Sequence, residues 1–420
     1  VMPAWLQLKY AHANGLLSDD IFAVANILKV MSLHRVSDIY GPLPVLHFGE
    51  TENPYNSQEE CYMHFFETLD SAIAVLKDVV ENNPDAKPLE EVDALYHGDY
   101  SKWLKLANSV KLRLAMRICY VKPDLAKQYA MEAVRDGVME TADDSALFQS
   151  WGSITIINPL EKIWNGYSDT RMGASMDSYL NGYNDPRLPV YFQPVTEGDN
   201  KGEYRGVANG MPNPQQEDYK AMSAPNVQEK STDSPLRWMM ASEVAFLRAE
   251  GAMRGWTAEM GGTAEEFYNK GIELSFLENG LSADAAARYA ADETSKPTDF
   301  TDVSAANTKY NISALGKITI KWNAGASEEE QLERIITQKW IAMFPNGTEA
   351  WSEFRRTGYP LIFPVRSNYP TSGVDTNKQI RRMVFPQSEY SNNGAAVQEA
   401  VKLLGGPDNG GTKLWWDKKN

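Results

Sequence analysis

Three short motifs fix where helices can begin in this chain. They are Ser-Gln-Glu-Glu at 57–60, Thr-Ala-Glu-Glu at 263–266 and Ser-Glu-Glu-Glu at 327–330. In a capping box of this kind, the hydroxyl accepts a hydrogen bond from a backbone N–H inside the first turn, and the glutamate reaches back to the cap. The first and third motifs precede apolar residues at steps of three and four, the spacing of one buried helix face. The motifs therefore predict helices over about 57–82, 264–277 and 327–345.

Further helices are predicted from caps, apolar spacing and Gly or Pro stops. They run over about 18–40, 101–120, 123–137, 242–254 and 394–404. Together with 264–277, these segments make two pairs of consecutive helices with the length and texture of a tetratricopeptide unit. The second pair carries small residues where helices would approach closely, namely Ala249, Gly251, Ala252 and Gly271. The expected fold class is mainly α, a tetratricopeptide-like helix-pair scaffold with a loop-rich subdomain and a few short strands.

The loop-rich part is marked by its composition. Gly, Asn, Asp, Pro and Tyr crowd together between about 140 and 235, which favours loops, short helices and short strands. Residues 280–315 are also polar and loop-like, and 317–322 alternates as a half-exposed strand does. A single unit over 1–420 is expected. Its helical scaffold covers about 1–137, 241–278 and 327–345, and its loop-rich subdomain covers about 140–240, 280–325 and 346–420.

Charge and hydropathy exclude several classes of protein. The chain has 41 Lys and Arg against 56 Asp and Glu, a net charge of −15. Nucleic acids and anionic lipid surfaces both attract basic faces, so neither is an expected partner. No apolar run approaches the roughly 20 residues that cross a bilayer. The two cysteines, Cys61 and Cys119, fall in amphipathic helical patterns and are expected to be buried free thiols.

The search for catalytic and metal motifs finds none. Nucleophile-elbow, zinc-protease, P-loop and dinucleotide motifs are missing, and the five histidines lack metal-ligand spacing. No metal and no cofactor are therefore expected. Carboxylate pairs such as Asp143-Asp144 leave a glycan-degrading hydrolase open, because a sequence cannot show their separation across a sugar. Arg113 and Arg117 share a helix face and are expected to pair with acidic neighbours.

Aromatic residues in loops are the richer signal. The chain has 11 Trp, 20 Tyr and 14 Phe. Many lie in the loop-rich part, namely Trp151, Trp164, Tyr167, Tyr179, Tyr183, Tyr191, Phe192 and Tyr204. An exposed ring can stack on the apolar face of a sugar while Asn, Asp and Arg bind its hydroxyls. Alternatively, the rings fill a second core beneath the loops, and we expect at least two of them to be exposed.

Several stretches resemble one protein family. QKWIAMFPNGTEAWSEFRRTGYP (338–360) resembles the C-terminal hallmark of the SusD/RagB family, nutrient-binding outer-membrane lipoproteins of Bacteroidetes-type bacteria. Five more stretches agree in order: HRVSDIYGPLPV (34–45), KWLKLANSVKLRLAMRI (102–118), NDPRLPVYFQP (184–194), SEVAFLRAEGAMRGW (242–256) and RRMVFPQSEYSNN (381–393). The similarity runs from about residue 4 to 417 and is strongest to the SusD-like branch with the long RRTGYP ending.

The resemblance implies a function and a partner. The function is non-catalytic capture of a glycan or other nutrient at the cell surface, and the partner is a SusC-like, TonB-dependent outer-membrane transporter. It also implies a lipidated N-terminal cysteine, which this chain lacks. Because the chain opens at VMPAWLQLKY, mid-helix in character, we expect the natural N-terminus to lie upstream. A glycan-degrading hydrolase and a tetratricopeptide adaptor that recognises a peptide remain alternatives.

The resemblance also directs the search for a site. Family members bind ligand on a face built from loops, including those after the early YGxxP turn. The ligand-binding candidates are Arg35, Asp38, Tyr40, Phe48 and Tyr55, followed by Trp164, Tyr167 and Tyr183. The 338–360 stretch is instead expected to be a structural corner. In it, Arg355 and Arg356 would bond to carbonyls or carboxylates and tie the scaffold to the tail.

Overall fold

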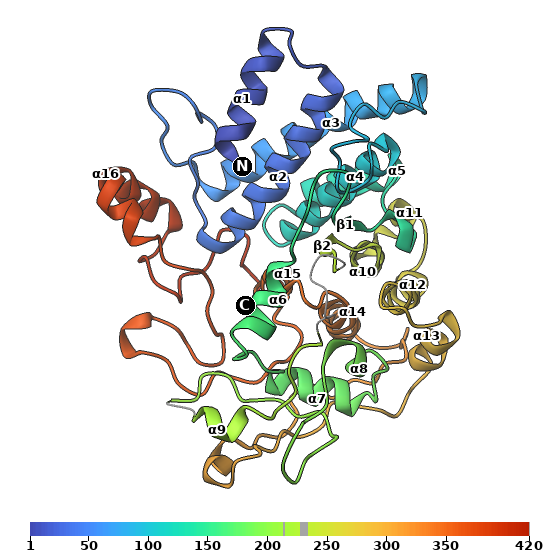
Figure 1. Ribbon diagram of the computed structural model, residues 1–420, viewed down its shortest axis with the longest axis vertical. Coiled ribbons are helices and arrows are strands. Elements are labelled where there is room, and N and C mark those ends of the chain that lie inside the picture. Colours follow the sequence, from blue (N-terminus) through green and yellow to red (C-terminus); the bar gives the residue numbers. More distant parts are fainter. Residues whose placement is uncertain (213–214, 227–233, 420) are drawn as a thin grey trace.

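The computed structural model describes residues 1–212, 215–226 and 234–419, and helices dominate it (Figure 1). The first five helices are α1 (Met2–Ala13), α2 (Asp19–Tyr40), α3 (Gln58–Asn82), α4 (Tyr100–Arg117) and α5 (Pro123–Arg135). Each packs against the next one along the chain. This arrangement confirms the predicted scaffold of consecutive helix pairs.

A second helical array follows in the chain and packs beside the first. It comprises α10 (Ala241–Gly251), η4 (Ala252–Trp256), α11 (Thr257–Met260), α12 (Ala264–Leu277), α13 (Ala283–Ala290), α14 (Glu328–Ala342) and α15 (Gly347–Thr357). α10 contacts α12, α14 and also α4, and so joins the two arrays. The small residue Gly271 permits the close α10–α12 approach, because a Cβ there would lie 2.7 Å from the Phe246 ring.

The predicted caps form. Ser57 and Thr263 each open a reciprocal capping box, with Glu60 and Glu266 as the returning side chains. Ser327 accepts from the backbone N–H of Glu330 at the start of α14. Local sequence therefore determines where these three helices begin.

Short elements, loops and the 18-residue helix α16 make up the rest of the described chain. They are η1 (Ala142–Asp144), β1 (Ala146–Phe148), α6 (Pro159–Glu161), η2 (Lys162–Gly166), α7 (Ala174–Gly182), α8 (Leu188–Tyr191), α9 (Gln216–Tyr219), β2 (Leu236–Met239), η5 (Ala305–Tyr310), η6 (Pro370–Ser372) and α16 (Gln387–Leu404). β1 and β2 pair antiparallel, with Ala146 opposite Met239 and a register shift after Ala146.

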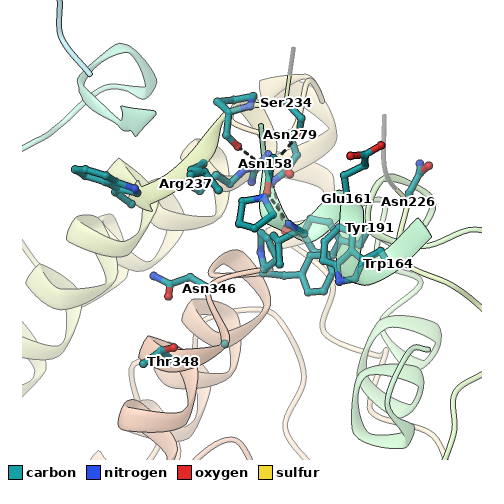
Figure 2. Close-up of a pocket in the computed structure, with 18 of the residues that line it drawn as sticks. Asn158, Glu161, Trp164, Tyr191, Asn226, Ser234, Arg237, Asn279, Asn346 and Thr348 are labelled. Atoms are coloured by element: carbon teal, nitrogen blue, oxygen red, sulfur yellow. Dashed lines mark hydrogen bonds between the residues drawn. The ribbon is translucent and has the colours of Figure 1, made fainter. Parts of the chain in front are cut away.

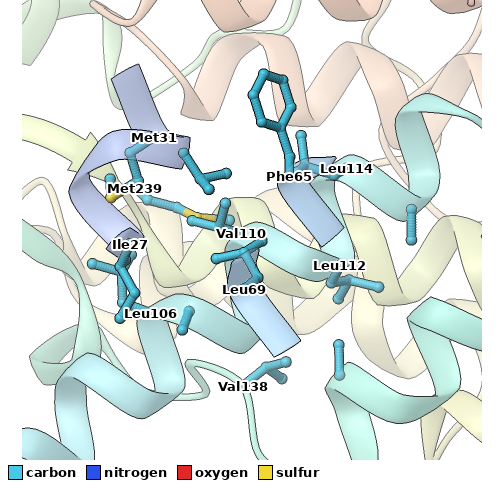
Figure 3. Packing of buried hydrophobic residues seen from close by; sticks show 14 of the residues in the cluster. Ile27, Met31, Phe65, Leu69, Leu106, Val110, Leu112, Leu114, Val138 and Met239 are labelled. Carbon is cyan, nitrogen blue, oxygen red and sulfur yellow. The ribbon is translucent and has the colours of Figure 1, made fainter. Parts of the chain in front are cut away.

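Two large apolar clusters hold the fold together. One lies among α2 to α5 and includes Ile27, Phe65 and Val110 (Figure 3). The other lies between α7, α10, α12 and α14 and includes Tyr183 and Ile336. Cys61 and Cys119 are buried free thiols, as predicted. Among the described residues, every helix is too short or too polar to cross a membrane.

Two local predictions are wrong. Residues 317–322 do not form a strand, although their alternation is real, since Ile318, Ile320 and Trp322 are buried. The carbonyls of Ile318 and Ile320 accept hydrogen bonds from tyrosine hydroxyls of Tyr183 and Tyr268 instead of a neighbouring strand. The second miss is α13, which lies in a segment expected to be loop; its two-turn length gives little periodicity to detect.

A buried charge network joins the two helical arrays. We use this name for Arg113, Arg117, Glu243, Glu250, Glu349, Glu353 and Arg356. Arg113 binds both carboxylate oxygens of Glu243 at 2.7 Å. Arg117 bonds Glu349 and lies 2.7 Å from Glu353. The acidic partners predicted for Arg113 and Arg117 are therefore confirmed.

The predicted role of the two arginines in the 338–360 stretch is also confirmed. Arg356 bonds both oxygens of Glu250, at 2.7 and 2.6 Å. Arg355 donates to the carbonyls of Asp38 and Arg381. These bonds tie α15 to the scaffold and to the tail.

Candidate functional site

A pocket of about 480 Å³ opens where α6, α8, β2 and the start of α15 meet. We call it the Trp164 pocket. Asn158, Ser234, Arg237 and Asn279 gather on one side of it, while Asn346 and Thr348 approach from the turn into α15 (Figure 2). Its volume falls within the range of ordinary small-molecule sites.

The apolar wall of the pocket is a group of aromatic rings. The ring of Trp164 stacks on Phe344, with centroids 5.9 Å apart and planes at 14°. Tyr191 and Phe192 pack on the same Phe344 ring at 4.8 and 5.0 Å. Trp164 is half-buried, so one part of the ring is supported and another faces solvent. Such a supported ring suits stacking on the apolar face of a sugar.

Local sequence explains how Trp164 reaches the pocket. Asn158 caps α6 through its Oδ1, which accepts from the Leu160 N–H at 3.0 Å, and Pro159 occupies the first helical position. The helical turn then continues into η2, which carries the tryptophan. The Asn158 amide also donates to the Pro235 carbonyl at 3.3 Å, which holds this turn against the segment before β2.

The polar wall is rich in amides. Asn279 donates to the Tyr191 hydroxyl at 3.3 Å and to the Ser275 carbonyl at 2.7 Å. Asn346 accepts from the Arg35 guanidinium at 2.8 Å. Each amide carries two N–H donors and an oxygen with two lone pairs. The bonds of Asn346 therefore leave capacity for the hydroxyls of a ligand.

Charge in the pocket is sparse. Burial lowers the pKa of Arg35, and the neighbouring Arg113 lowers it further. Arg237 donates to the Glu278 carbonyl at 3.2 Å. Glu161 is the carboxylate among the described lining residues, and it is half-buried. No group of three or more His, Cys, Asp or Glu within the described part of the chain is arranged to hold a metal ion.

A second pocket has a volume of about 630 Å³, and its lining begins at Tyr167, three residues after Trp164 in the sequence. We call it the Tyr167 pocket. Its lining includes Tyr167, Arg171 and Met172 from the loop after η2, and Gln216 and Tyr219 from α9. The side chain of Tyr167 is 60% exposed.

The structure gathers some of the predicted site residues and separates others. Arg35 and Trp164 line the same pocket, and Tyr167 lines the neighbouring one. Tyr40 and Tyr55 lie elsewhere, both packed on Phe385 beside α16. Phe48 is half-buried in the loop after the YGxxP turn.

Two predicted ligand contacts, Asp38 and Tyr183, must be corrected because the side chains are buried. Asp38 accepts from the Tyr62 hydroxyl at 2.5 Å and from the Trp416 indole at 2.9 Å. Burial alone would raise the pKa of Asp38, but the Arg117 guanidinium and the neighbouring His34 together outweigh burial and lower the pKa. Tyr183 lies in the second apolar cluster and donates to the Ile318 carbonyl at 3.3 Å. Both residues hold the interior together.

Sequence reasoning missed the residues of the polar wall. Asn158, Asn279 and Asn346 carry no motif of their own, although Asn158-Pro159 is a recognisable helix start. The 338–360 stretch, predicted to be a structural corner, has a second part: residues 344–348 line the Trp164 pocket. The Pro345-Asn346-Gly347 turn is the signal that could have directed attention there, because turns present exposed polar groups.

Comparison with known proteins gives a consistent result. A model of the SusD-like family, described as Susd and RagB outer membrane lipoprotein, matches residues 1–417. A search among curated proteins found no match.

Solved structures resemble the chain along nearly its whole length. A chitin-binding SusD homologue from Flavobacterium johnsoniae is 41% identical with a TM-score of 0.91, and the match covers 98% of this chain and 84% of that one. A SusD-like protein from Bacteroides thetaiotaomicron is 41% identical with a TM-score of 0.92, covering 100% and 85%. A SusD homologue from Bacteroides vulgatus is 34% identical with a TM-score of 0.90, covering 100% and 84%.

Proposed function

Because this chain belongs to the SusD-like family of outer membrane lipoproteins, we propose that it binds a glycan in the Trp164 pocket and delivers it to a transporter. The observation that carries the proposal is the pairing of a supported, half-exposed tryptophan ring with amide and guanidinium groups around one opening. Stacking recognises the apolar face of a sugar ring, and the amides bind its hydroxyls.

The first ligand to try is a chitin oligosaccharide. A chitin-binding SusD homologue is 41% identical to this chain over almost its full length. The N-acetyl groups of chitin are amides, which both donate and accept hydrogen bonds. The asparagines of the polar wall, such as Asn279 and Asn346, match that chemistry.

Binding takes place without bond cleavage. The chain belongs to a family of non-catalytic carbohydrate-binding proteins. Glycoside hydrolysis requires two carboxyl groups flanking the scissile bond. Among the described lining residues of the Trp164 pocket, Glu161 alone supplies one. A single carboxylate disfavours the hydrolase. Membership of a carbohydrate-binding family disfavours the peptide-binding adaptor.

Delivery requires a partner in the same membrane. The family is one of outer membrane lipoproteins. The proposed partner is a SusC-like, TonB-dependent outer-membrane transporter, with this protein held at the cell surface by a lipid anchor. The scaffold of packed helices would keep the pocket in a fixed orientation to that transporter.

The proposal is tested by calorimetric titration with chitin oligosaccharides and a glycan array. Trp164→Ala should reduce affinity for the bound sugar by about 1–3 kcal/mol, the range of a central contact. Trp151→Ala is the matched control, because that ring is exposed outside the pocket. Unchanged affinity in Trp164→Ala, or sugar cleavage on long incubation, would refute the proposal. Co-purification with a large outer-membrane barrel tests the partner separately.

A further inference from the structure

One segment lines both pockets. Residues 158–161 and Trp164 line the Trp164 pocket, and residues 167–169, 171 and 172 line the Tyr167 pocket. Trp164 and Tyr167 are three residues apart, about one helical turn. Residues 162–166, which carry Trp164 and lead to Tyr167, are largely exposed, and the Ile163 side chain is 40% exposed.

Tyr167 differs from the buried tyrosines of the loop-rich part. Its side chain is 60% exposed, and the Lys162 ammonium lies 5.9 Å from its ring centroid. In contrast, Tyr179 and Tyr183 are almost fully buried and pack against each other. An exposed ring at the edge of a pocket has a free face on which a ligand can stack.

The loop that carries Tyr167 is held in place. Arg171 donates to the carbonyls of Ser168 and Thr170 on its own loop, at 3.1 and 2.8 Å. The same guanidinium donates to the Lys220 carbonyl at 2.6 Å, next to α9. These bonds connect the two walls of the Tyr167 pocket. Because the loop is already ordered, stacking on Tyr167 costs little further conformational entropy.

The Tyr167 pocket also has polar side chains that are available to form hydrogen bonds with a ligand. Within the described residues, the side chains of Ser168, Asn209 and Gln216 make no hydrogen bond of their own. Met172 and Tyr219, which also line this pocket, are buried, and the Tyr219 hydroxyl donates to Asp302 at 3.0 Å. An accessible ring beside unused hydroxyl and amide groups repeats the chemistry of the Trp164 pocket.

We infer that the two pockets are successive parts of one binding path, and that the ligand is a linear oligosaccharide long enough to reach from Trp164 to Tyr167. One end stacks on Trp164 and the other on Tyr167. The inference rests on the proposed function, since it extends the glycan from the Trp164 pocket. A protein built this way prefers long oligosaccharides over short ones, because the second set of contacts forms without a second loss of translational freedom.

The test is calorimetric titration of the full chain with chitin oligosaccharides of increasing length. Wild-type affinity should rise with length and then level off, with one long oligosaccharide bound per chain. Tyr167→Ala should weaken binding of the long oligosaccharides by about tenfold and leave the short ones unchanged. Tyr167→Phe, which keeps the ring, should bind like the wild type.

The matched control is Tyr369→Ala, because Tyr369 is 85% exposed and lines neither pocket. Thermal melting should be equal for the wild type and all three tyrosine variants. Two long oligosaccharides bound per chain, or equal affinity of Tyr167→Ala and wild type for every length, would overturn the inference. Those results leave the proposed function standing as long as Trp164→Ala still weakens the short oligosaccharides.

Discussion

The buried charge network and the Trp164 pocket use similar polar side chains, but they differ in what those groups have left to bond. In the network, Arg113 and Arg356 each face a carboxylate through two bonds, and Arg117 faces several. In the pocket, Arg35 bonds the amide of Asn346, with no carboxylate paired to it among the described residues. Groups that face oppositely charged partners hold the helices together, whereas groups with spare bonding capacity remain available to a ligand.

The two regions meet in a single stretch of sequence. Residues 344–348 line the pocket and run into the first turn of α15, and Glu349, Glu353 and Arg356 further along the same helix belong to the network. The pocket wall is therefore anchored directly to the most interconnected part of the interior. The comparison predicts that changes in the network act on stability and that changes in the pocket act on binding.

The largest effect is expected from Arg117→Met. Removing the guanidinium leaves Glu349, Glu353 and Asp38 buried with fewer partners. Breaking a buried pair in this way typically costs about 3–5 kcal/mol of unfolding free energy. Urea denaturation measures it. Arg135→Met is the matched control, since Arg135 is 64% exposed and its pairing with Asp136 should matter little. Equal stability of the two variants would contradict the assignment.

The next effect concerns pH and Glu250. Burial alone would raise its pKa, but Arg356 and Arg254 outweigh burial and lower the pKa below 4.5. A carboxyl whose pKa is depressed in the folded state stabilises fully above its unfolded pKa, and this contribution is lost as pH falls further. Wild-type stability should therefore fall steeply below about pH 4.5.

Glu250→Gln separates this contribution from the rest. The variant should be less stable than wild type at pH 7, by roughly 3 kcal/mol. Its melting temperature should decline less steeply below about pH 4.5, because the group that takes up the proton is gone. Thermal melts over that pH range measure both quantities. Parallel curves for the two proteins would show that Glu250 is not the responsible carboxylate.

In the pocket, Arg35→Met and Asn346→Ala test whether the hydrogen bond between these two residues supports binding. Each should weaken glycan binding by about 1–2 kcal/mol, since each removes one partner of a single hydrogen bond that orients the polar wall. Because the residues act together, the double variant should lose less affinity than the sum of the two. Calorimetric titration gives the three values. A stability loss in Arg35→Met as large as that of Arg117→Met would place Arg35 in the network instead.

Sequence predicts those parts of this molecule that are decided locally. Ser57, Thr263 and Ser327 begin their helices because the cap and its partner lie three residues apart. The segment 317–322 shows the limit of prediction from local sequence. Its alternation correctly predicts which side chains are buried, but a strand also requires a neighbouring strand, and that depends on distant parts of the chain.

The candidate site shows the same limit. Arg35 and Asp38 are one turn apart on α2, yet Arg35 lines the pocket and Asp38 is enclosed by Tyr62 and by Trp416 from the far end of the chain. The spacing in the sequence predicts that both residues lie on one helix. It does not predict which side of that helix the C-terminal tail covers. Trp164 was predicted from its loop composition, but its neighbours across the pocket come from elements brought together only by tertiary packing.

The division of the chain into a helical scaffold and a loop-rich subdomain stays a prediction.

The smallest effect is expected from Tyr55→Phe, which tests whether a third surface takes part in binding. The Tyr55 hydroxyl donates to Glu389 on α16 at 2.8 Å, and its ring packs edge-on against Phe385. Phenylalanine keeps the ring and removes the hydrogen bond, so unfolding free energy should fall by about 1 kcal/mol. Glycan affinity should not change, because Tyr55 lines neither pocket. A loss of affinity would extend the binding surface to Tyr40 and Tyr55. It would also show that a polar group already bonded within the fold, the Tyr55 hydroxyl, can take part in binding.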